Sequence, residues 1–199
     1  MPLKLQKLEA LKRRLPLNHE KRRDIEEEYA KTMAGYRGEQ TVDYHLKILH
    51  NDKNFILHDI RLLNGSAFFQ IDTLICNPAF FLIIEVKNIS GTLIFDQVFH
   101  QLIRNSNGKE EAFPDPISQV KRHHHQLTTW LKDNKVPEIP VEWIVVISHP
   151  STLIKSSPIN SNIGKKIIHS AALSNIIEEF TNKYKEKKFS NLDLKKLSN

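Results

Sequence analysis

The sequence predicts a domain of the α/β class, in which helices pack on a mixed central β-sheet. Segments with a helical pattern alternate with short runs rich in β-branched and aromatic residues, in the order helix, three or four strands, helix and strand. Hydrophobic residues make up 40% of the chain and charged residues 26%, a mixture typical of globular proteins. The 199 residues suffice for one main domain with extensions at its ends.

Two helices are expected in the N-terminal part. Residues 18–34 are charged and contain no Gly or Pro, and Asn18 is a suitable N-cap. The sequence Gly-Tyr-Arg-Gly at 35–38 is expected to end this helix. A second helix is expected over residues 39–49. Its apolar residues recur on one face: Val42, Leu46 and Leu49.

Three strands are then expected as an antiparallel meander. Residues 55–63 form the first, and the dipeptide Asn64-Gly65 is a typical hairpin turn into the second, 67–76. After Asn77-Pro78, the apolar run 80–86 forms the third.

The remaining elements follow from similar signals. Residues 92–104 supply one or two strands before a turn at 105–108. Pro116 fits the first turn of a helix that runs to Asp133. A strand over 141–148 and a helix over 170–184 complete the order. This divides the chain into a basic helical N-terminal extension (1–33), a core (34–150) and a helical, lysine-rich C-terminal extension (151–199).

The charge distribution favours a nucleic acid partner. The net charge is +6 and the pI is near 9.3, and residues 1–23 carry eight Lys or Arg against two Glu. Lysines also gather near the C-terminus: Lys183, Lys185, Lys187 and Lys188. Such surfaces attract polyanions by counterion release, although a solvated helix face has the same composition.

Membrane and secretory classes are not expected. The longest apolar run, 79–84, is far below the roughly 20 residues that span a bilayer, and the N-terminus does not resemble a signal peptide. Cys76 is the only cysteine, which excludes an intramolecular disulfide. We therefore expect a cytoplasmic protein.

Three ionisable residues are expected to converge on the sheet. Glu85 and Lys87 are two residues apart on one strand, so both side chains point to the same face. Asp72 lies on the preceding strand of the meander, which brings its carboxylate near Glu85. Glu85 also ends an apolar strand, where a charge is costly unless it is paired or bound to a metal.

Two adjacent carboxylates are typical ligands of Mg²⁺ or Mn²⁺. A divalent ion held in this way can activate water and stabilise charge on a phosphodiester, while the neighbouring lysine helps neutralise the phosphate. The pattern thus favours hydrolysis of a nucleic acid backbone. The other interpretation is an ordinary Glu85–Lys87 ion pair at the end of a strand, with Asp72 at the surface.

Four ordered motifs resemble the nuclease-related domain (NERD) family, which belongs to the PD-(D/E)xK group with a restriction-endonuclease-like core. The motifs are Gly35-Tyr36-Arg37-Gly38-Glu39, Gln70-Ile71-Asp72, Glu85-Val86-Lys87-Asn88 with Gly91, and Pro116 with Gln119. The resemblance spans about Ala34 to Pro150. Gln70-Ile71 stands where many members of the group have a proline, a form common in NERD-like sequences.

The resemblance implies a role for each matched residue. Asp72 resembles the central metal-binding aspartate, Glu85 the second carboxylate and Lys87 the catalytic lysine. Glu39 matches an acidic residue that can complete the metal shell, although a glutamate at a helix N-terminus is also favoured by the macrodipole. Gln119 matches a polar residue that can orient water or Lys87, although a surface glutamine is the alternative.

The run His123-His124-His125 cannot bind one ion as a unit, because consecutive helical residues point about 100° apart. His123 is four residues after Gln119 and shares its face. It could approach a phosphate, with Lys121 and Arg122 as backbone contacts, or belong to a polar helix face. Arg37 is a further candidate for contact with nucleic acid.

Three functional hypotheses remain open at this point. The first is a Mg²⁺-dependent nuclease acting on DNA. The second is a non-catalytic nucleic-acid-binding module, and the third is an adaptor that recruits a DNA-processing partner through its terminal helices. Because the sequence has no Gly-x-x-x-x-Gly-Lys loop, a helicase or kinase acting with it would be a separate chain.

Overall fold

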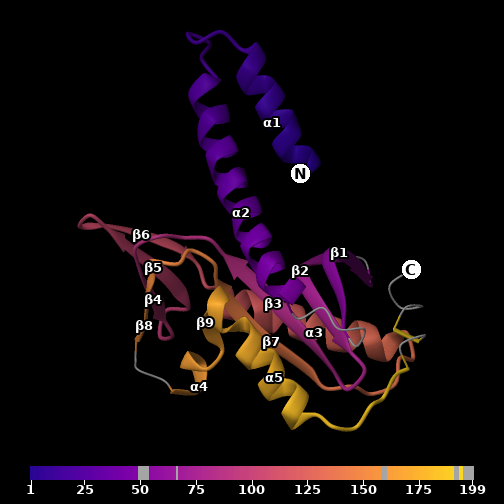
Figure 1. Ribbon diagram of the computed structural model, residues 1–199. Helices are drawn as coiled ribbons and strands as arrows, with labels where there is room; N and C mark the ends of the chain where they lie inside the picture. The colour runs from indigo at the N-terminus through magenta and orange to yellow at the C-terminus, as the bar shows by residue number, and fades with distance from the viewer. Residues whose placement is uncertain (49–53, 66, 158–160, 191–192, 195–199) are drawn as a thin grey trace.

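The chain has an α+β fold with a restriction-endonuclease-like core, as its sequence predicted (Figure 1). The computed structural model describes residues 1–48, 54–65, 67–157, 161–190 and 193–194. The helices are α1 (Leu3–Arg14), α2 (Arg22–Ile48), α3 (Pro116–Asp133), α4 (Ser161–Gly164) and α5 (Leu173–Lys183), with a 3₁₀ turn, η1 (Ser170–Ala172), before α5.

The strands form two sheets. The main sheet has the order β1-β2-β3-β7-β9, with β1 (Phe55–Asn64), β2 (Ala67–Asn77), β3 (Phe80–Lys87), β7 (Val141–Ile147) and β9 (Ile167–His169). The smaller sheet has the order β6-β5-β4-β8, with β4 (Thr92–Asp96), β5 (Gln101–Ser106), β6 (Lys109–Pro114) and β8 (Leu153–Ser157).

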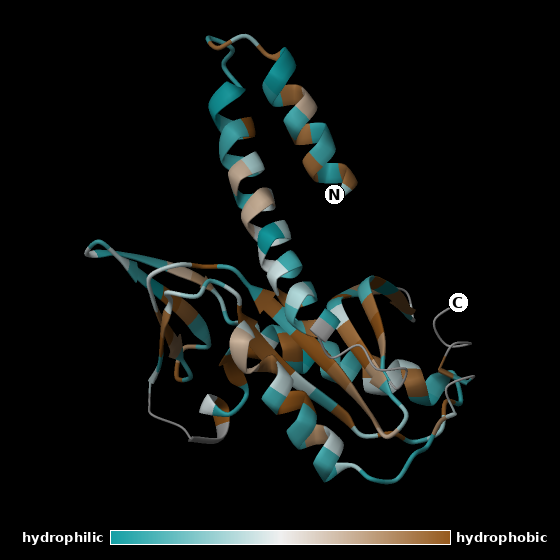
Figure 2. Ribbon diagram, in the orientation of Figure 1, coloured by the Kyte–Doolittle hydropathy of each residue, from teal (hydrophilic) through white to brown (hydrophobic). Residues whose placement is uncertain are grey.

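The main sheet is mixed and covered on both faces. β1, β2 and β3 are antiparallel neighbours, whereas β7 runs parallel to β3 and β9 runs parallel to β7. Alternate residues of β3 enter two cores, as a two-residue period requires. Phe81 and Ile83 pack with α3, and Leu82 and Ile84 pack with α2 and α5. Figure 2 shows these brown, apolar strands at the centre of the molecule.

Helices α1 and α2 form a hairpin that projects away from the sheets, while the later part of α2 reaches the main sheet (Figure 1). Leu5 and Leu8 of α1 are buried in this hairpin. The Arg22 guanidinium donates to the carbonyls of Lys12 and Leu15 at 2.6 and 2.8 Å, which satisfies free acceptors at the end of α1. None of the described helices has the length and apolar character needed to cross a membrane.

The N-terminal part differs from the sequence prediction, because one helix replaces two. α2 continues through residues 35–38, and it begins at Arg22, so Asn18 is not its N-cap. Gly38 lets the helix pack closely against Asn88, where a Cβ on residue 38 would lie only 2.8 Å from the Asn88 Cβ. This close packing compensates for the low helix propensity of glycine. The Asn88 amide also donates to the Ala34 carbonyl at 2.7 Å. The expected end at Leu49 lies outside the described residues.

The other predicted elements are confirmed, including the meander, the turn at Asn64-Gly65, α3, β7 and α5. Three strands were not predicted: β6, β8 and β9. β9 has only three residues, too few to show a period, and β6 is largely charged because it forms the edge of the smaller sheet. Short segments of this kind carry little sequence signal.

Candidate active site

β3 positions the first two residues of the site at its C-terminal end. Glu85 is the last residue of a fully buried stretch and is 1% exposed, while Lys87 is half-buried two residues later. Both side chains lie on the α3 side of the sheet, and the Lys87 ammonium donates to Oε1 of Glu85 at 2.6 Å. The predicted shared face is therefore present, and the buried carboxylate has a charged partner.

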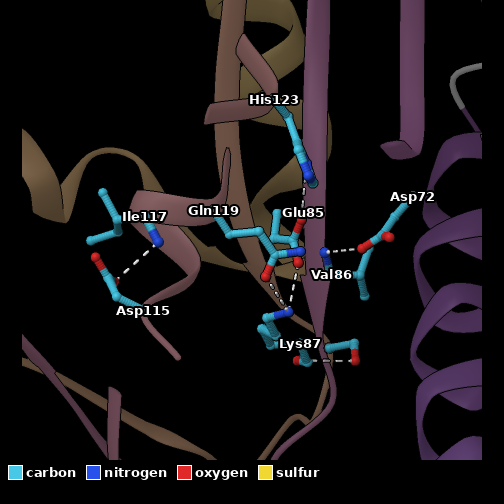
Figure 3. A network of polar contacts seen from close by, with 9 residues as sticks. Asp72, Glu85, Val86, Lys87, Asp115, Ile117, Gln119 and His123 are labelled. Atoms are coloured by element: carbon cyan, nitrogen blue, oxygen red, sulfur yellow. Dashed lines mark hydrogen bonds and ion pairs between the residues drawn. The ribbon is translucent and has the colours of Figure 1, made fainter. Parts of the chain in front are cut away.

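β2 brings Asp72 to the same place. Thr73 pairs with Ile84 across the antiparallel ladder, so the residue before Thr73 lies beside the end of β3. Oδ2 of Asp72 accepts a hydrogen bond from the Val86 N–H at 3.3 Å. Figure 3 shows Asp72 on one side of β3 and Gln119 on the other, with Glu85 and Lys87 between them.

Burial gives this carboxylate pair unusual protonation. The pKa of Glu85 is raised to about 7: burial and, to a smaller extent, the charge of Asp72 raise it, and Lys87 partly offsets both effects. Burial also raises the pKa of Asp72, although the Val86 N–H and the charge of Lys87 act in the opposite direction. Two negative charges are therefore costly in this site, and an added cation would stabilise them.

Helix α3 supplies Gln119 and His123. The helix begins at Pro116 because the Asp115 carboxylate accepts from the N–H groups of Ile117 and Ser118 at 3.1 and 3.0 Å. One turn later, Oε1 of Gln119 accepts from the Lys87 ammonium at 3.2 Å. One further turn on, Nδ1 of His123 lies 3.8 Å from Oε2 of Glu85 (Figure 3).

The three consecutive histidines point in different directions, as helix geometry requires. His123 is buried at the site, His124 contacts the Val141 carbonyl at 3.0 Å, and His125 is exposed. Nδ1 of His123 is buried and has no hydrogen-bond partner in the described part of the chain. Burial lowers the pKa of His123, so its neutral form is favoured.

The two basic residues beside His123 occupy different environments. The Lys121 ammonium lies 5.9 Å from the ring centroid of Trp143 on β7, and so is turned from the carboxylates. Arg122 is exposed, but its charge lowers the pKa of both Glu85 and His123. Of this pair, Arg122 is the residue whose charge acts on the site.

Glu39 reaches the site from α2. The preceding Gly38 allows the helix to approach the ends of β3 and β7, because its missing Cβ would lie 2.9 Å from Oγ of Ser148. Glu39 is exposed at the surface, yet partial burial of its carboxylate raises its pKa, and among the neighbouring charges Asp72 has the largest additional effect. Arg37 instead lines an open surface hollow with Gln40, Thr41 and Tyr44.

Two acidic residues near the site were not predicted. Asp59 occupies the gap between the paired positions His58–Thr73 and Ile60–Ile71, which places it across from Asp72, and its φ is +54°. Its charge raises the pKa of Asp72 and of Glu39, and Asp43 also raises that of Glu39. The hairpin at Asn64-Gly65 contains the missed signal, because it sets a register in which residues 59 and 72 face each other.

The donor set fits a hard divalent ion in its chemistry. Asp72, Glu85 and Glu39 offer carboxylate oxygens, and burial together with the repulsion between neighbouring carboxylates raises the pKa of each. In the described part of the chain, however, no three His, Cys, Asp or Glu side chains are already close enough to hold a metal ion. Lys87 occupies Oε1 of Glu85, and the distance between the carboxylates means that they would have to move together to share an ion.

Comparison with known proteins gives one positive result. The family model described as nuclease-related domain matches residues 34–148, which is more than half of the chain and includes every residue of the site described above. No curated protein and no solved structure matches the chain.

Proposed function

The chain belongs to the nuclease-related domain family, and from this premise we propose that it is a Mg²⁺- or Mn²⁺-dependent nuclease that hydrolyses phosphodiester bonds of DNA. Asp72, Glu85 and Lys87 form the chemical centre of this proposal. Glu39, Gln119 and His123 surround them.

One observation carries the proposal. Glu85 is 1% exposed, yet it lies beside a second carboxylate, and its pKa is raised to about 7. Placing a carboxylate pair at the end of a buried strand costs stability, and one lysine only partly offsets this cost. A catalytic cation site explains why such a pair is present, because functional sites are where strongly perturbed pKa values cluster.

Each residue has a role that its contacts support. Asp72 and Glu85 would hold the metal ion, with Glu39 available from the α2 side. The ion would supply positive charge to polarise the phosphate and lower the pKa of water. Lys87, held by Glu85 and Gln119, can neutralise a phosphate oxygen or orient the attacking water. Arg122 adds an exposed positive charge for the DNA backbone, whereas Lys121, stacked near Trp143, is the weaker candidate.

A non-catalytic DNA-binding module is the second candidate. It is favoured by the absence of three preassembled metal-binding side chains among the described residues. Such a module would bind DNA with the salt dependence typical of phosphate contacts, but Asp72 and Glu85 would be dispensable for its activity.

Cleavage of a mixture of linear, circular and single-stranded DNA in Mg²⁺ or Mn²⁺ separates the two candidates. We expect cutting by the wild type, and loss of at least about a hundredfold in Asp72→Asn and in Lys87→Met. Asp133→Asn and Lys132→Met, both exposed at the far end of α3, are the matched controls and should cut normally. Folded wild type that binds DNA without cutting it would favour the binding module.

A further inference from the structure

We infer that the groove between α2 and the β5–β6 hairpin receives the sugar-phosphate backbone of one nucleic acid strand beside the bond to be cut. This inference rests on the proposed function and extends it, because it assigns a binding surface and the kind of ligand that enters it.

The groove is continuous with the candidate active site. It has a volume of about 790 Å³, and one wall is formed by Lys31, Ala34 and Gly35 of α2. Lys87 also lines it, and the same ammonium donates to Glu85 and Gln119. A strand whose phosphate reaches Lys87 therefore continues into this groove.

Gly35 marks the part of α2 that a ligand can approach. A Cβ added at Gly35 would meet no heavy atom within 4 Å, whereas one added at Gly38 would lie 2.8 Å from Asn88. Packing thus explains Gly38 but not Gly35, although glycine within a helix costs stability at both positions. An exposed glycine that lines a groove allows another backbone to approach the helix closely.

The walls of the groove suit a nucleotide chain. Lys31 is exposed and forms no ion pair in the described part of the chain. Opposite it, Arg104 is fixed by hydrogen bonds to the carbonyl and hydroxyl of Ser90 and by an ion pair with Glu111 at 3.2 Å. Phe113 adds an apolar surface for a sugar or base.

The size of the groove favours one strand over an intact double helix. Its volume lies in the range of about 300–1,000 Å³ that small ligands occupy, which corresponds to a short segment of one strand. A duplex would need to present one strand to the groove, whereas a single-stranded substrate could enter directly.

Fluorescence anisotropy with the full chain tests the inference. The probes are one fluorescein-labelled oligonucleotide, alone and as a duplex, in EDTA so that divalent ions are absent. We expect Gly35→Leu to weaken binding of the single strand about tenfold or more by filling the groove. Lys31→Gln should weaken single-strand binding several-fold. It should also make the slope of log affinity against log salt concentration shallower by about 1, as expected for one lost phosphate contact. Gly164→Leu is the matched control, since an added Cβ at Gly164 also meets nothing within 4 Å, and it should bind normally.

Circular dichroism with heating checks that each variant folds, and Gly35→Leu should melt no lower than the wild type because leucine favours helix. Affinities of Gly35→Leu and Lys31→Gln within about twofold of the wild type would overturn the inference, as would a wild type that binds neither probe. Normal DNA cleavage by Gly35→Leu and Lys31→Gln would also overturn the inference about the groove, but it would leave the proposed nuclease function intact. If both variants lose binding but the wild type does not cleave DNA, the groove binds nucleic acid as inferred and the proposed nuclease activity is contradicted.

Discussion

At the scale of single residues, the site is defined by a charge placed where the fold disfavours it. Glu85 belongs to the strand with the most complete burial, and its surroundings hold Asp72 on one side and His123 and Lys87 on the other. The protein thus carries a local cost in the absence of a bound ion. This cost gives the residue a measurable effect on stability.

We predict that Glu85→Gln stabilises the metal-free protein at alkaline pH. The pKa of Glu85 is raised from 4.5 in the unfolded chain to about 7 in the folded protein, so the native state loses stability as pH rises through this window. Because glutamine cannot ionise, we expect Glu85→Gln to raise the free energy of unfolding by about 1–2 kcal/mol at pH 8. This is less than the pKa shift alone would give, because the substitution also removes the ion pair with Lys87. Urea unfolding in EDTA measures it.

The same comparison at pH 5 is the control, because most of the glutamic acid is then protonated in the native state and the two proteins should differ little. A variant that is less stable than the wild type at pH 8 would show that the Glu85–Lys87 pair is an ordinary stabilising interaction.

Sequence spacing predicted the centre of the site, and the family resemblance added Glu39 and Gln119. The two-residue period of a strand placed Glu85 and Lys87 together, and the four-residue spacing of a helix placed Gln119 and His123 together. Asp59 was missed because its strand was interpreted from apolar residues alone. Asp43 was missed although it is four residues after Glu39 on the helix expected there, a spacing that places both on one face. The turning of Lys121 toward Trp143 depends on tertiary packing that spacing does not contain.

At the scale of elements, α2 runs from the projecting hairpin to the site and contains two glycines, Gly35 and Gly38, with different roles. Sequence reasoning treated both as helix breakers, whereas the structure uses one for packing and leaves the other facing a groove. Local propensity was overruled by contacts with β3 and β7, which are distant in the sequence.

We predict opposite stability changes for Gly35→Ala and Gly38→Ala. Alanine at 35 should stabilise the protein by about 0.5–1 kcal/mol, because it favours helix and meets no neighbour. Alanine at 38 should destabilise it by about 1–3 kcal/mol, because its Cβ must displace Asn88 and Ser148. Thermal or urea unfolding measures both. Equal effects of the two substitutions would contradict the packing role of Gly38.

The start of α3 offers a second test at this scale. We predict that Asp115→Ala destabilises the protein by about 1–2 kcal/mol, since its buried carboxylate caps the N–H groups of Ile117 and Ser118. It should also reduce cleavage, because Gln119 lies in the first turns that the cap fixes. Asp115→Asn, which keeps an acceptor, is the control and should recover part of the stability. Full activity in Asp115→Ala would show that the cap does not position Gln119.

At the scale of the whole molecule, the site lies where the main sheet, the smaller sheet and the later part of α2 meet. The sequence predicted the main sheet apart from β9, because its other strands are longer and rich in apolar residues. It did not separate the smaller sheet from the larger one, since β8 comes from the polar region after residue 150 and pairs with β4, which is far away in the chain. Long-range parallel pairing leaves no local period to detect.

The contacts that hold the end of α5 on the main sheet predict that the protein loses stability at low pH. The Glu142 carboxylate binds Lys166 at 2.6 Å, Lys183 at 2.7 Å and the Tyr184 hydroxyl, and these hydrogen bonds lower the pKa of Glu142 to about 2 despite an opposing effect of burial. We expect Glu142→Gln to cost about 2 kcal/mol at pH 7.

The pH dependence follows from the direction of this shift. The carboxylate contributes its stability above its unfolded pKa of 4.5 and loses it as pH falls toward about 2. The difference between wild type and Glu142→Gln in urea unfolding should therefore shrink over that window. A difference that stays constant down to pH 2 would mean that the ionised carboxylate is not responsible.

Calorimetric titration with Mn²⁺ at pH 6 and pH 8 tests the divalent cation site that we propose at Asp72 and Glu85. We predict that wild-type affinity rises with pH and that binding releases a proton, because the pKa of Glu85 near 7 must be overcome. Asp72→Asn and Glu85→Gln should lose this binding, while Asp133→Asn keeps it. Equal Mn²⁺ affinity in the wild type and in both site variants would show that these two carboxylates do not bind the ion.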